Sequence, residues 1–418
     1  MNKRVAVIGG RPAPIYGAKK LGIDVVLVHE EGAYEQEIVA HCEKIVHADI
    51  TDGNAVINAL EELHLQRPFD RIITTTEVAG ESTGKAVDHF GLAGVSYKTA
   101  HLLKDKLAMR DLLAAHDLSP VAYSRVDCKE DAIEFVNRYG RSVLKPAEGV
   151  ASLHIHPCED EQSVFSALKA LEAAGVKNII IEEYLEGPVV SVDSFSFARQ
   201  HIPIGYSEYR MNDRYVEWEV STPSTAAKPW LSELRSMTCR LLDVLELEEG
   251  PSHSEFVLTK KGPRILESHA RLAGSGAPSL VKRAFGLDLN RMFLTVPLGI
   301  DNLPEVSPEP IAGAAIQFFV PAPGTVKEVN LNLAPDVDVR RTKVGETPLV
   351  FLPYLFELDD AKNAVVIQKH EGEYIPPLNT VADCVSGYVL ATGASREDAV
   401  AIANDLVEGV HFIIEPQP

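Results

Sequence analysis

The chain has 418 residues, of which 45% are hydrophobic and 24% are charged, which is typical of a soluble globular protein with two or three domains. Its formal net charge of −20 repels polyanions, so we expect no nucleic-acid partner, although local cations can still attract a small anion. No apolar run approaches the roughly 20 residues that span a bilayer, and the N-terminus enters a strand without a signal-peptide core. We therefore expect a cytoplasmic protein without membrane insertion.

The five cysteines are scattered along the chain and form no CxxC pair. They are Cys42, Cys128, Cys158, Cys239 and Cys384. This spacing predicts neither a disulfide framework nor a thiolate zinc site.

The first 95 residues alternate β-rich and helical patterns. Strands are predicted over 4–8, 25–28, 45–47 and 71–74, and helices over 15–21, 54–64 and 81–90. This order predicts a doubly wound parallel α/β domain ending near residue 95. The turn at Gly9 and Gly10 lacks the GxGxxG spacing, which argues against NAD or FAD binding.

Two lysines in the next segment are candidates for phosphate binding. A helix predicted over 99–116 has Lys106 within its apolar stripe, where a cation either meets an anion or extends past the stripe. Lys145 ends a strand predicted over 142–144 and precedes a small loop that contains Gly149 and Ser152. Backbone N–H groups and a hydroxyl beside a lysine suit a phosphate, although KP followed by EG is also a common strand exit.

The stretch NIIIEEYLEGPVVSVDSFSF predicts a strand, a hinge and a second strand, after helices predicted over 131–139 and 163–174. Such an element can offer backbone groups to a flat heterocycle, while Glu182 or Glu183 accepts a hydrogen bond from an exocyclic amine. The alternative is a strand that ends in ordinary polar residues.

The stretch SEFVLTKKGPRILESHARLAGSG, residues 254–276, predicts a β-hairpin with a three-residue loop over residues 260–262. That loop places Val257 opposite Ile265 and Glu255 opposite Glu267.

Facing carboxylates repel each other, so a divalent cation such as Mg²⁺ between Glu255 and Glu267 explains the pair. The alternative is a solvated acidic hairpin neutralised by Arg264 or Lys260. His269 and Arg271 continue the same face of the hairpin.

The remainder of the chain offers fewer signals. An alternating strand pair over 205–221 carries Arg210, Arg214 and Trp218, which either line a pocket or form the outer face of a strand. A helix is predicted over 231–245, a Pro-rich segment over about 299–353, strands over 365–377 and 384–392, and a closing helix over 396–407.

Four elements in order, KDKLAMRDLL, VLKPAEGVAS, IIIEEYLEG and the hairpin, resemble the ATP-grasp carboxylate-amine ligases over nearly the whole chain. The LKPA loop, ARLAGSG and the tail VSGYVLATGASREDAVAIA are most similar to the L-amino acid ligases, which make dipeptides or amidate related acids. The resemblance implies a doubly wound parallel α/β domain followed by an ATP-grasp fold of two α+β subdomains that clasp ATP. The implied divisions are a Rossmann-like N-terminal domain (1–95), a small lid subdomain with a linker helix (96–185), and a large subdomain (186–418) with a β-rich extension from about 300.

The resemblance also implies roles for individual residues. The implied ATP-binding residues are Lys106 and Lys145 on the α- and β-phosphates, Gly149 and Ser152 in the loop over the γ-phosphate, and Glu182, Glu183 and the backbone of Leu185 at the adenine. Glu255 and Glu267 would hold Mg²⁺, with Mn²⁺ as a substitute, and catalytic Arg271 would lie by the transferred phosphoryl group and the substrate carboxylate.

This chain departs from the family pattern at three places. His269 stands where the family usually has Asn, so it either binds the metal itself or only contacts a metal ligand. Val189 replaces a Glu that binds the ribose hydroxyls in many relatives, which leaves Asp193 as a candidate for that role. The phosphate loop is also poorer in glycine than is usual in the family.

The implied reaction joins a carboxylate to an amine through an acyl phosphate, with two small molecules, expected to be amino acids, as substrates. Glu208, Glu217 and His269 are candidate bases for the amine, and a proton passed to water or phosphate would need none of them. Two alternatives are a ligase for a non-proteinogenic acid and a nucleotide-binding regulatory protein without catalysis. Homodimers are common in the family, but the sequence indicates no interface.

Overall fold

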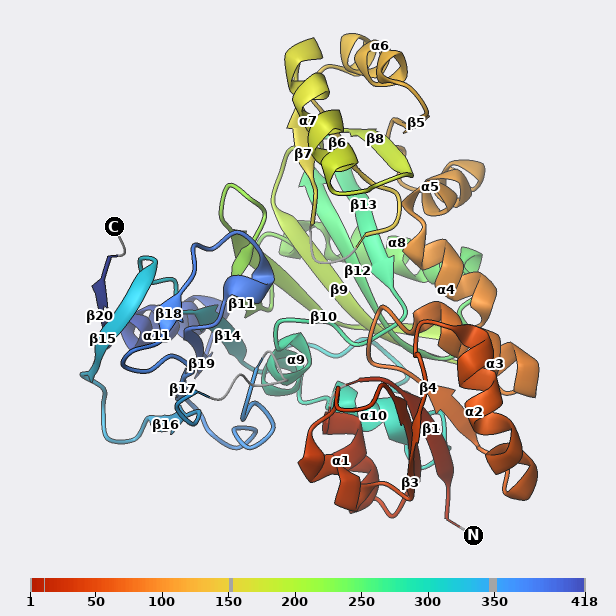
Figure 1. The fold of residues 1–418 in the computed structure, drawn as a ribbon, viewed down its shortest axis with the longest axis vertical. Coiled ribbons are helices and arrows are strands. Elements are labelled where there is room, and N and C mark those ends of the chain that lie inside the picture. The colour runs from red at the N-terminus through yellow and green to blue at the C-terminus, as the bar shows by residue number, and fades with distance from the viewer. Residues whose placement is uncertain (1, 11, 150–152, 346–351, 417–418) are drawn as a thin grey trace.

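The structure is a computed structural model that describes residues 2–10, 12–149, 153–345 and 352–416. Four β-sheets organise these described residues (Figure 1). The N-terminal sheet lies at the lower right of the view, a small sheet forms the upper lobe, and a long central sheet runs from between them toward the C-terminal lobe at the left. Within the described residues, no helix is long and apolar enough to cross a membrane.

The N-terminal sheet has the strand order β3-β2-β1-β4, and all of its neighbours are parallel. Hydrophobic clusters cover both faces of this sheet, which explains why β1 is buried along its whole length. The predicted doubly wound parallel fold is therefore confirmed. Its elements are β1 (Arg4–Ile8), α1 (Pro12–Lys20), β2 (Asp24–His29), η1 (Gln36–His41), β3 (Lys44–His47), α2 (Gly53–Gln66), β4 (Arg71–Ile73) and α3 (Gly80–Phe90).

The prediction of one continuous helix over 99–116 is wrong. The chain instead forms two helices there, α4 (Tyr97–Lys104) and α5 (Lys106–Ala115). Asp105 separates them: it has an extended backbone, and its carboxylate accepts hydrogen bonds from the N–H groups of Leu107 and Ala108. A short acceptor side chain at this place is a helix N-cap, so the first helix ends and a second begins. Lys106 is consequently the first residue of α5 rather than part of one continuous stripe.

The upper lobe contains an antiparallel sheet in the order β5-β8-β6-β7. Helices α6 and α7 pack against it through a cluster that includes Val136, Val164 and Ile181. The elements are β5 (Tyr123–Val126), α6 (Lys129–Tyr139), β6 (Ser142–Pro146), β7 (His156–Cys158), α7 (Glu161–Ala173) and β8 (Ile179–Glu183).

The central sheet has nine strands in the order β13-β12-β9-β10-β11-β14-β19-β17-β16, and only the pair β16 and β17 is parallel. Its first half packs on α5, α8 (Leu231–Val244) and α10 (Leu289–Thr295) in one hydrophobic cluster, and α11 (Arg396–Glu408) packs on β14 and β19. The strands are β9 (Val189–Phe197), β10 (Gln200–Met211), β11 (Glu217–Thr222), β12 (Gly250–Thr259), β13 (Gly262–His269), β14 (Gly313–Phe318), β16 (Asp338–Arg341), β17 (Ala364–Ile367) and β19 (Gly387–Gly393).

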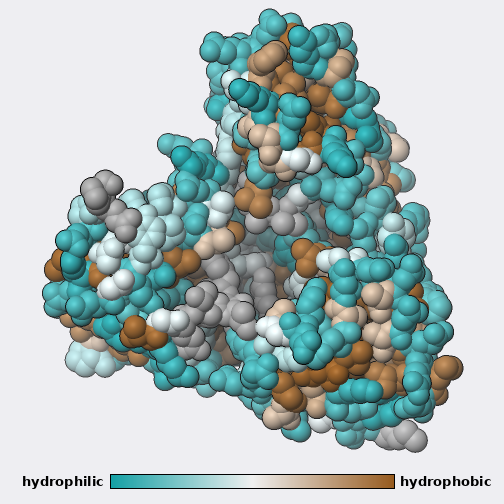
Figure 2. Space-filling model, in the orientation of Figure 1, coloured by the Kyte–Doolittle hydropathy of each residue, from teal (hydrophilic) through white to brown (hydrophobic). Residues whose placement is uncertain are grey.

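The fourth sheet, β18-β15-β20, is antiparallel and borders the C-terminal lobe. It shows that the strand predicted over 365–377 is two short strands in different sheets. The remaining elements are η2 (Lys228–Trp230), α8 (Leu231–Val244), α9 (Ala277–Phe285), α10 (Leu289–Thr295), β15 (Gly324–Leu331), β18 (Tyr374–Ile375), η3 (Val381–Asp383), α11 (Arg396–Glu408) and β20 (Val410–Glu415). Figure 2 shows a mostly hydrophilic face that is indented between the upper and the C-terminal lobes.

Candidate active site

The β12–β13 hairpin carries the two carboxylates predicted to hold a metal. Thr259 pairs with Gly262, so the turn contains two residues, and Val257 faces Arg264; the three-residue loop and the pairing of Val257 with Ile265 are wrong. A bulge between Glu255 and Phe256 then corrects the register. Glu255 and Glu267 are therefore partners, as predicted, and only the part of the hairpin between this bulge and the turn is shifted by one residue.

Two rows of polar residues cross the neighbouring strands β9, β12 and β13. Asp193, His253 and His269 form one row, and Ser191, Glu255 and Glu267 form the next. Because side chains two residues apart on a strand share a face, both rows point to the same side of the sheet.

His253 joins these rows and is 4% exposed. Its Nδ1 lies 2.9 Å from Asp193 Oδ1, and its Nε2 lies 3.3 Å from Glu255 Oε1. Burial alone would lower the pKa of the imidazole, but the two carboxylates outweigh burial and raise it to about 10. A positively charged imidazole thus lies next to the pair Glu255 and Glu267. Asp193, the candidate for ribose binding, contacts this imidazole.

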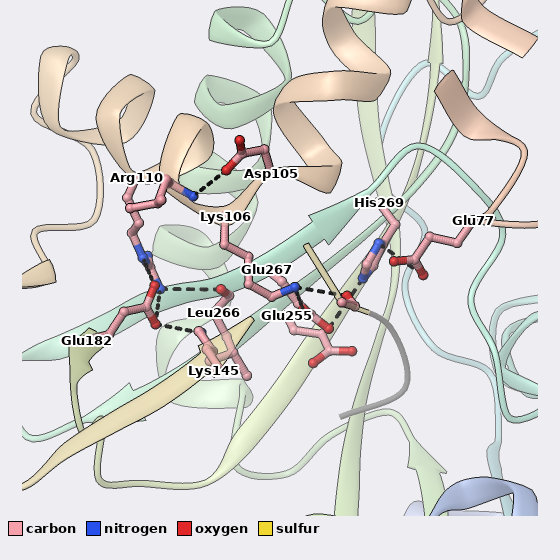
Figure 3. A network of polar contacts seen from close by, with 12 residues as sticks. Glu77, Asp105, Lys106, Arg110, Lys145, Glu182, Glu255, Leu266, Glu267 and His269 are labelled. Carbon is pink, nitrogen blue, oxygen red and sulfur yellow. Dashed lines mark hydrogen bonds and ion pairs between the residues drawn. The ribbon is translucent and has the colours of Figure 1, made fainter. Parts of the chain in front are cut away.

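Lys106 approaches the pair from the other side. Its Nζ donates to the carbonyl of Gly149 at 3.0 Å and lies 3.9 Å from Glu267 Oε2, and Figure 3 shows it reaching toward Glu267. His269 Nε2 lies 3.4 Å from Glu267 Oε1. Burial would raise the pKa of Glu267, but His269 and Lys106 hold it well below its ordinary value. The carboxylate of Glu267 is therefore ionised beside a cation.

Lys145 and Glu182 lie next to each other inside the upper lobe. Lys145 Nζ is 2.6 Å from Glu182 Oε2, and the buried Arg110 donates to Glu182 Oε1 from Nε at 2.7 Å (Figure 3). Burial opposes ionisation of Glu182, yet Arg110 and Lys145 lower its pKa to about 2. Burial also lowers the pKa of Lys145 below its ordinary value. One carboxylate thus meets two cations, which leaves positive charge available to an anion.

The other residues predicted to bind the nucleotide are Glu183, Leu185 and Ser152. Glu183 Oε1 accepts a hydrogen bond from the N–H of Ala122 at 2.8 Å, so this carboxylate fixes a loop. Leu185 lies in the connection between β8 and β9, outside both ladders, where its backbone groups are not used in strand pairing. Ser152 lies outside the described residues. The nucleotide contacts of these residues remain predictions.

Arg271 follows β13 and reaches the N-terminal domain. Its guanidinium donates to Glu77 Oε2 at 2.7 Å and to the carbonyl of Leu272 at 3.1 Å. Glu77 also lies 3.6 Å from Nδ1 of His269. A carboxylate therefore already occupies one side of Arg271, which shows that the guanidinium can bind such a group here.

The candidate base Glu217 has a raised pKa. Burial and the nearby Glu255 raise its pKa to about 7, and its carboxylate accepts a hydrogen bond from Ser275 Oγ at 3.2 Å. Glu208 instead pairs with Arg396 and accepts a 2.7 Å hydrogen bond from Ser224.

The sequence leaves two alternatives open for Arg210, Arg214 and Trp218, an acceptor pocket or the outer face of a strand. The half-exposed Arg210 covers the ring of Trp218 at 4.4 Å and pairs with Glu219, and Arg214 contacts Asn379. These contacts fit the outer face of a strand.

The carboxylate pair fits a magnesium–nucleotide complex better than an isolated cation. The described residues contain no group of three or more His, Cys, Asp or Glu side chains that could hold a metal ion. Mg²⁺ is commonly bound by one or two carboxylates together with substrate phosphates and water. Glu255 and Glu267, with Lys106 beside them, match that donor set.

Comparison with protein families identifies the class. An ATP-grasp N-terminal domain model matches residues 15–94, and an ATP-grasp domain model matches residues 141–279. The chain belongs to the ATP-grasp superfamily, which confirms the resemblance seen in the four sequence elements.

Its relatives include amino acid ligases. The chain is 23% identical over 414 residues to an uncharacterized protein of Sinorhizobium fredii, covering 96% of this chain and 80% of that protein. It is 24% identical over 290 residues to an L-arginine-specific L-amino acid ligase of Bacillus subtilis, covering 67% and 70%. The crystal structure of an L-amino acid ligase from Bacillus licheniformis matches with a TM-score of 0.78 at 19% identity and covers 99% of both chains, which shows the same fold over nearly the whole length.

Proposed function

We propose that the protein is an ATP-dependent ligase that joins the carboxylate of one amino acid to the amine of another. The observation that carries this proposal is the placement of Arg271 four residues beyond Glu267, so that a carboxylate-binding guanidinium follows directly on a candidate metal carboxylate. The likeness to amino acid ligases supports the choice of substrates.

In the first step, the substrate carboxylate attacks the γ-phosphorus of ATP in line. The bond between the γ-phosphorus and the bridging oxygen breaks, ADP leaves, and an acyl phosphate forms. Arg271 orients the carboxylate with its two-pronged donor geometry, which a lysine cannot reproduce. Lys106 and Lys145 neutralise the phosphates, and Mg²⁺ bound by Glu255 and Glu267 would supply further charge stabilisation.

In the second step, the amine attacks the acyl carbon, the amide bond forms, and phosphate leaves. An α-amine has an ordinary pKa of about 8, so most of it must lose a proton before it attacks. We assign Glu217 as the acceptor, because its pKa of about 7 lies near the working range of a general base.

The acyl phosphate must be protected from water. We propose that residues 96–185 act as the small lid subdomain over residues 186–418, with 1–95 as the N-terminal domain. The connection of Lys106 Nζ to the carbonyl of Gly149 ties α5 to the phosphate loop on this lid. Enclosure by the two subdomains would keep the intermediate dry.

Trapping of the intermediate tests the proposal. Hydroxylamine added with Mg-ATP and a single amino acid should give the amino acid hydroxamate, ADP and phosphate in equal amounts. Hydroxamate formed only from a non-proteinogenic acid would retain the ligase chemistry but change the substrate. ATP cleavage that never depends on an acid would contradict the proposal.

A further inference from the structure

Two histidines face each other across the hairpin, and each contacts the carboxylate two residues away on its own strand. His253 and His269 are register partners, with ring centroids 6.4 Å apart and planes 14° from parallel. His253 Nε2 lies 3.3 Å from Glu255, and His269 Nε2 lies 3.4 Å from Glu267. Both candidate metal carboxylates are thus supported from the same side.

His253 and His269 differ in the contacts that fix their imidazole rings. His253 Nδ1 lies 2.9 Å from Asp193, which is its register partner on β9 and is 1% exposed. His269 Nδ1 lies 3.6 Å from Glu77, beyond hydrogen-bond distance, and Glu77 also binds Arg271. The ring of His253 is therefore fixed at both nitrogens inside the sheet, whereas that of His269 is held less firmly.

Glu255 depends on this support. In the described part of the chain, its carboxylate has no hydrogen-bond partner other than His253. Ser191, its register partner on β9, already accepts the hydroxyl of Tyr209 at 2.7 Å. Glu267, its register partner on β13, is a like charge and repels the carboxylate of Glu255.

Building on the proposed function, we propose that Asp193 and His253 are positioning residues that hold Glu255 in the orientation required to bind the divalent cation of the ATP complex. His253 contacts one carboxylate oxygen, Oε1, which would leave Oε2 available to the cation. Asp193 fixes the ring so that its Nε2 points at Glu255. Groups that orient metal ligands in this way commonly change metal affinity about 10- to 100-fold when they are replaced.

The test is a Mn²⁺ titration followed by electron paramagnetic resonance, with the full-length protein and saturating ADP. We expect His253→Gln to weaken Mn²⁺ binding about 10- to 100-fold. ADP affinity measured in EDTA should stay at the wild-type value. Asp193→Asn should weaken Mn²⁺ binding in the same direction, and the double variant should bind no more weakly than His253→Gln, because Asp193 acts through His253.

His201→Gln is a matched control. His201 is another mostly buried histidine of the same sheet, on β10, and it contacts Ser196 at 2.7 Å and Asp243 at 3.4 Å, away from the carboxylate pair. Its replacement should leave Mn²⁺ affinity unchanged. Circular dichroism and thermal unfolding check the fold of each variant, and Asp193→Asn, which keeps the side-chain shape, is the readout if His253→Gln does not fold.

Three outcomes would overturn the inference. Wild-type Mn²⁺ affinity in folded His253→Gln, or additive losses in the double variant, would reject the positioning role while leaving the ligase proposal intact. A wild-type protein that binds ADP but no Mn²⁺ would reject both.

Discussion

Glu255 and Glu267 face each other on adjacent strands, with a lysine ammonium 3.9 Å from one of them and an imidazole 3.3 Å from the other. Directly opposed carboxylates destabilise a sheet unless positive charge lies close by. Lys106 and His253 provide that charge from two sides, which favours a carboxylate pair that is available to a divalent cation. The metal-binding hypothesis rests on this arrangement.

Replacing Glu267 should separate activity from folding. We expect Glu267→Ala to lower Mg²⁺-dependent ATP turnover at least about 100-fold, since one of two metal carboxylates is lost. The circular dichroism spectrum should remain that of the wild type. Glu328→Ala, an exposed carboxylate on β15, is the control and should retain full turnover. Undiminished activity in Glu267→Ala would remove the metal site from the account.

Arg271 should respond to a change that keeps its charge. We expect Arg271→Lys to lower kcat/KM for the acid substrate on the order of 100-fold, because lysine cannot hold a carboxylate in a fork. ATP affinity should change little, since the phosphates are assigned to Lys106 and Lys145. Steady-state kinetics and calorimetry provide the two measurements. Loss of ATP affinity with an unchanged KM for the acid would place Arg271 on the nucleotide instead.

Glu182 should matter for stability. Glu182→Ala leaves Arg110 and Lys145 buried without their carboxylate, which should lower the free energy of unfolding by about 3–5 kcal/mol. Glu183→Ala, which loses only the hydrogen bond to Ala122, should cost about 1–2 kcal/mol. Urea unfolding measures both values. Equal losses in the two variants would contradict the structure of this cluster.

Glu217 should make stability depend on pH. Its pKa is about 7 in the folded protein and 4.5 in the reference state, so between these values the folded state binds the extra proton. The contribution of this group is therefore greatest below pH 4.5 and is lost as the pH rises toward 7. In the absence of Mg²⁺, Glu217→Gln should gain stability relative to the wild type between pH 5 and 7.5. Parallel stability curves for the two proteins would show that Glu217 has an ordinary pKa.

The local pattern of the sequence predicted the N-terminal domain well, because buried parallel strands and amphipathic helices have distinct periods. It failed at Asp105, where a single N-cap divides what reads as one helix. The capping signal was present, since Asp105 precedes a good helical run. The sequence pattern also gave the wrong register near the turn of the hairpin, because no residue type in this stretch indicates the bulge beside Glu255.

Arg110, Glu77 and His253 were not predicted as members of the site. Arg110 lies four residues after Lys106, so the shared face of α5 was a usable signal, but an arginine in a helix is usually exposed. Glu77 reaches Arg271 from a different domain, and no local pattern reports such a contact. His253 alternates with Glu255 on one strand face, yet its partner Asp193 becomes visible only when β9 is placed beside β12.

The measurement that tests the central claim most directly is phosphate release from Mg-ATP over all pairs of the twenty amino acids, with mass spectrometry of the products. The account predicts phosphate release in equal amount to a dipeptide for at least one pair, and a reduction of both signals on the order of 100-fold in Arg271→Lys at low concentrations of the acid. Phosphate release that is independent of any acid, or silence across both this panel and non-proteinogenic acids, would contradict a carboxylate-amine ligase and favour a regulatory nucleotide-binding protein.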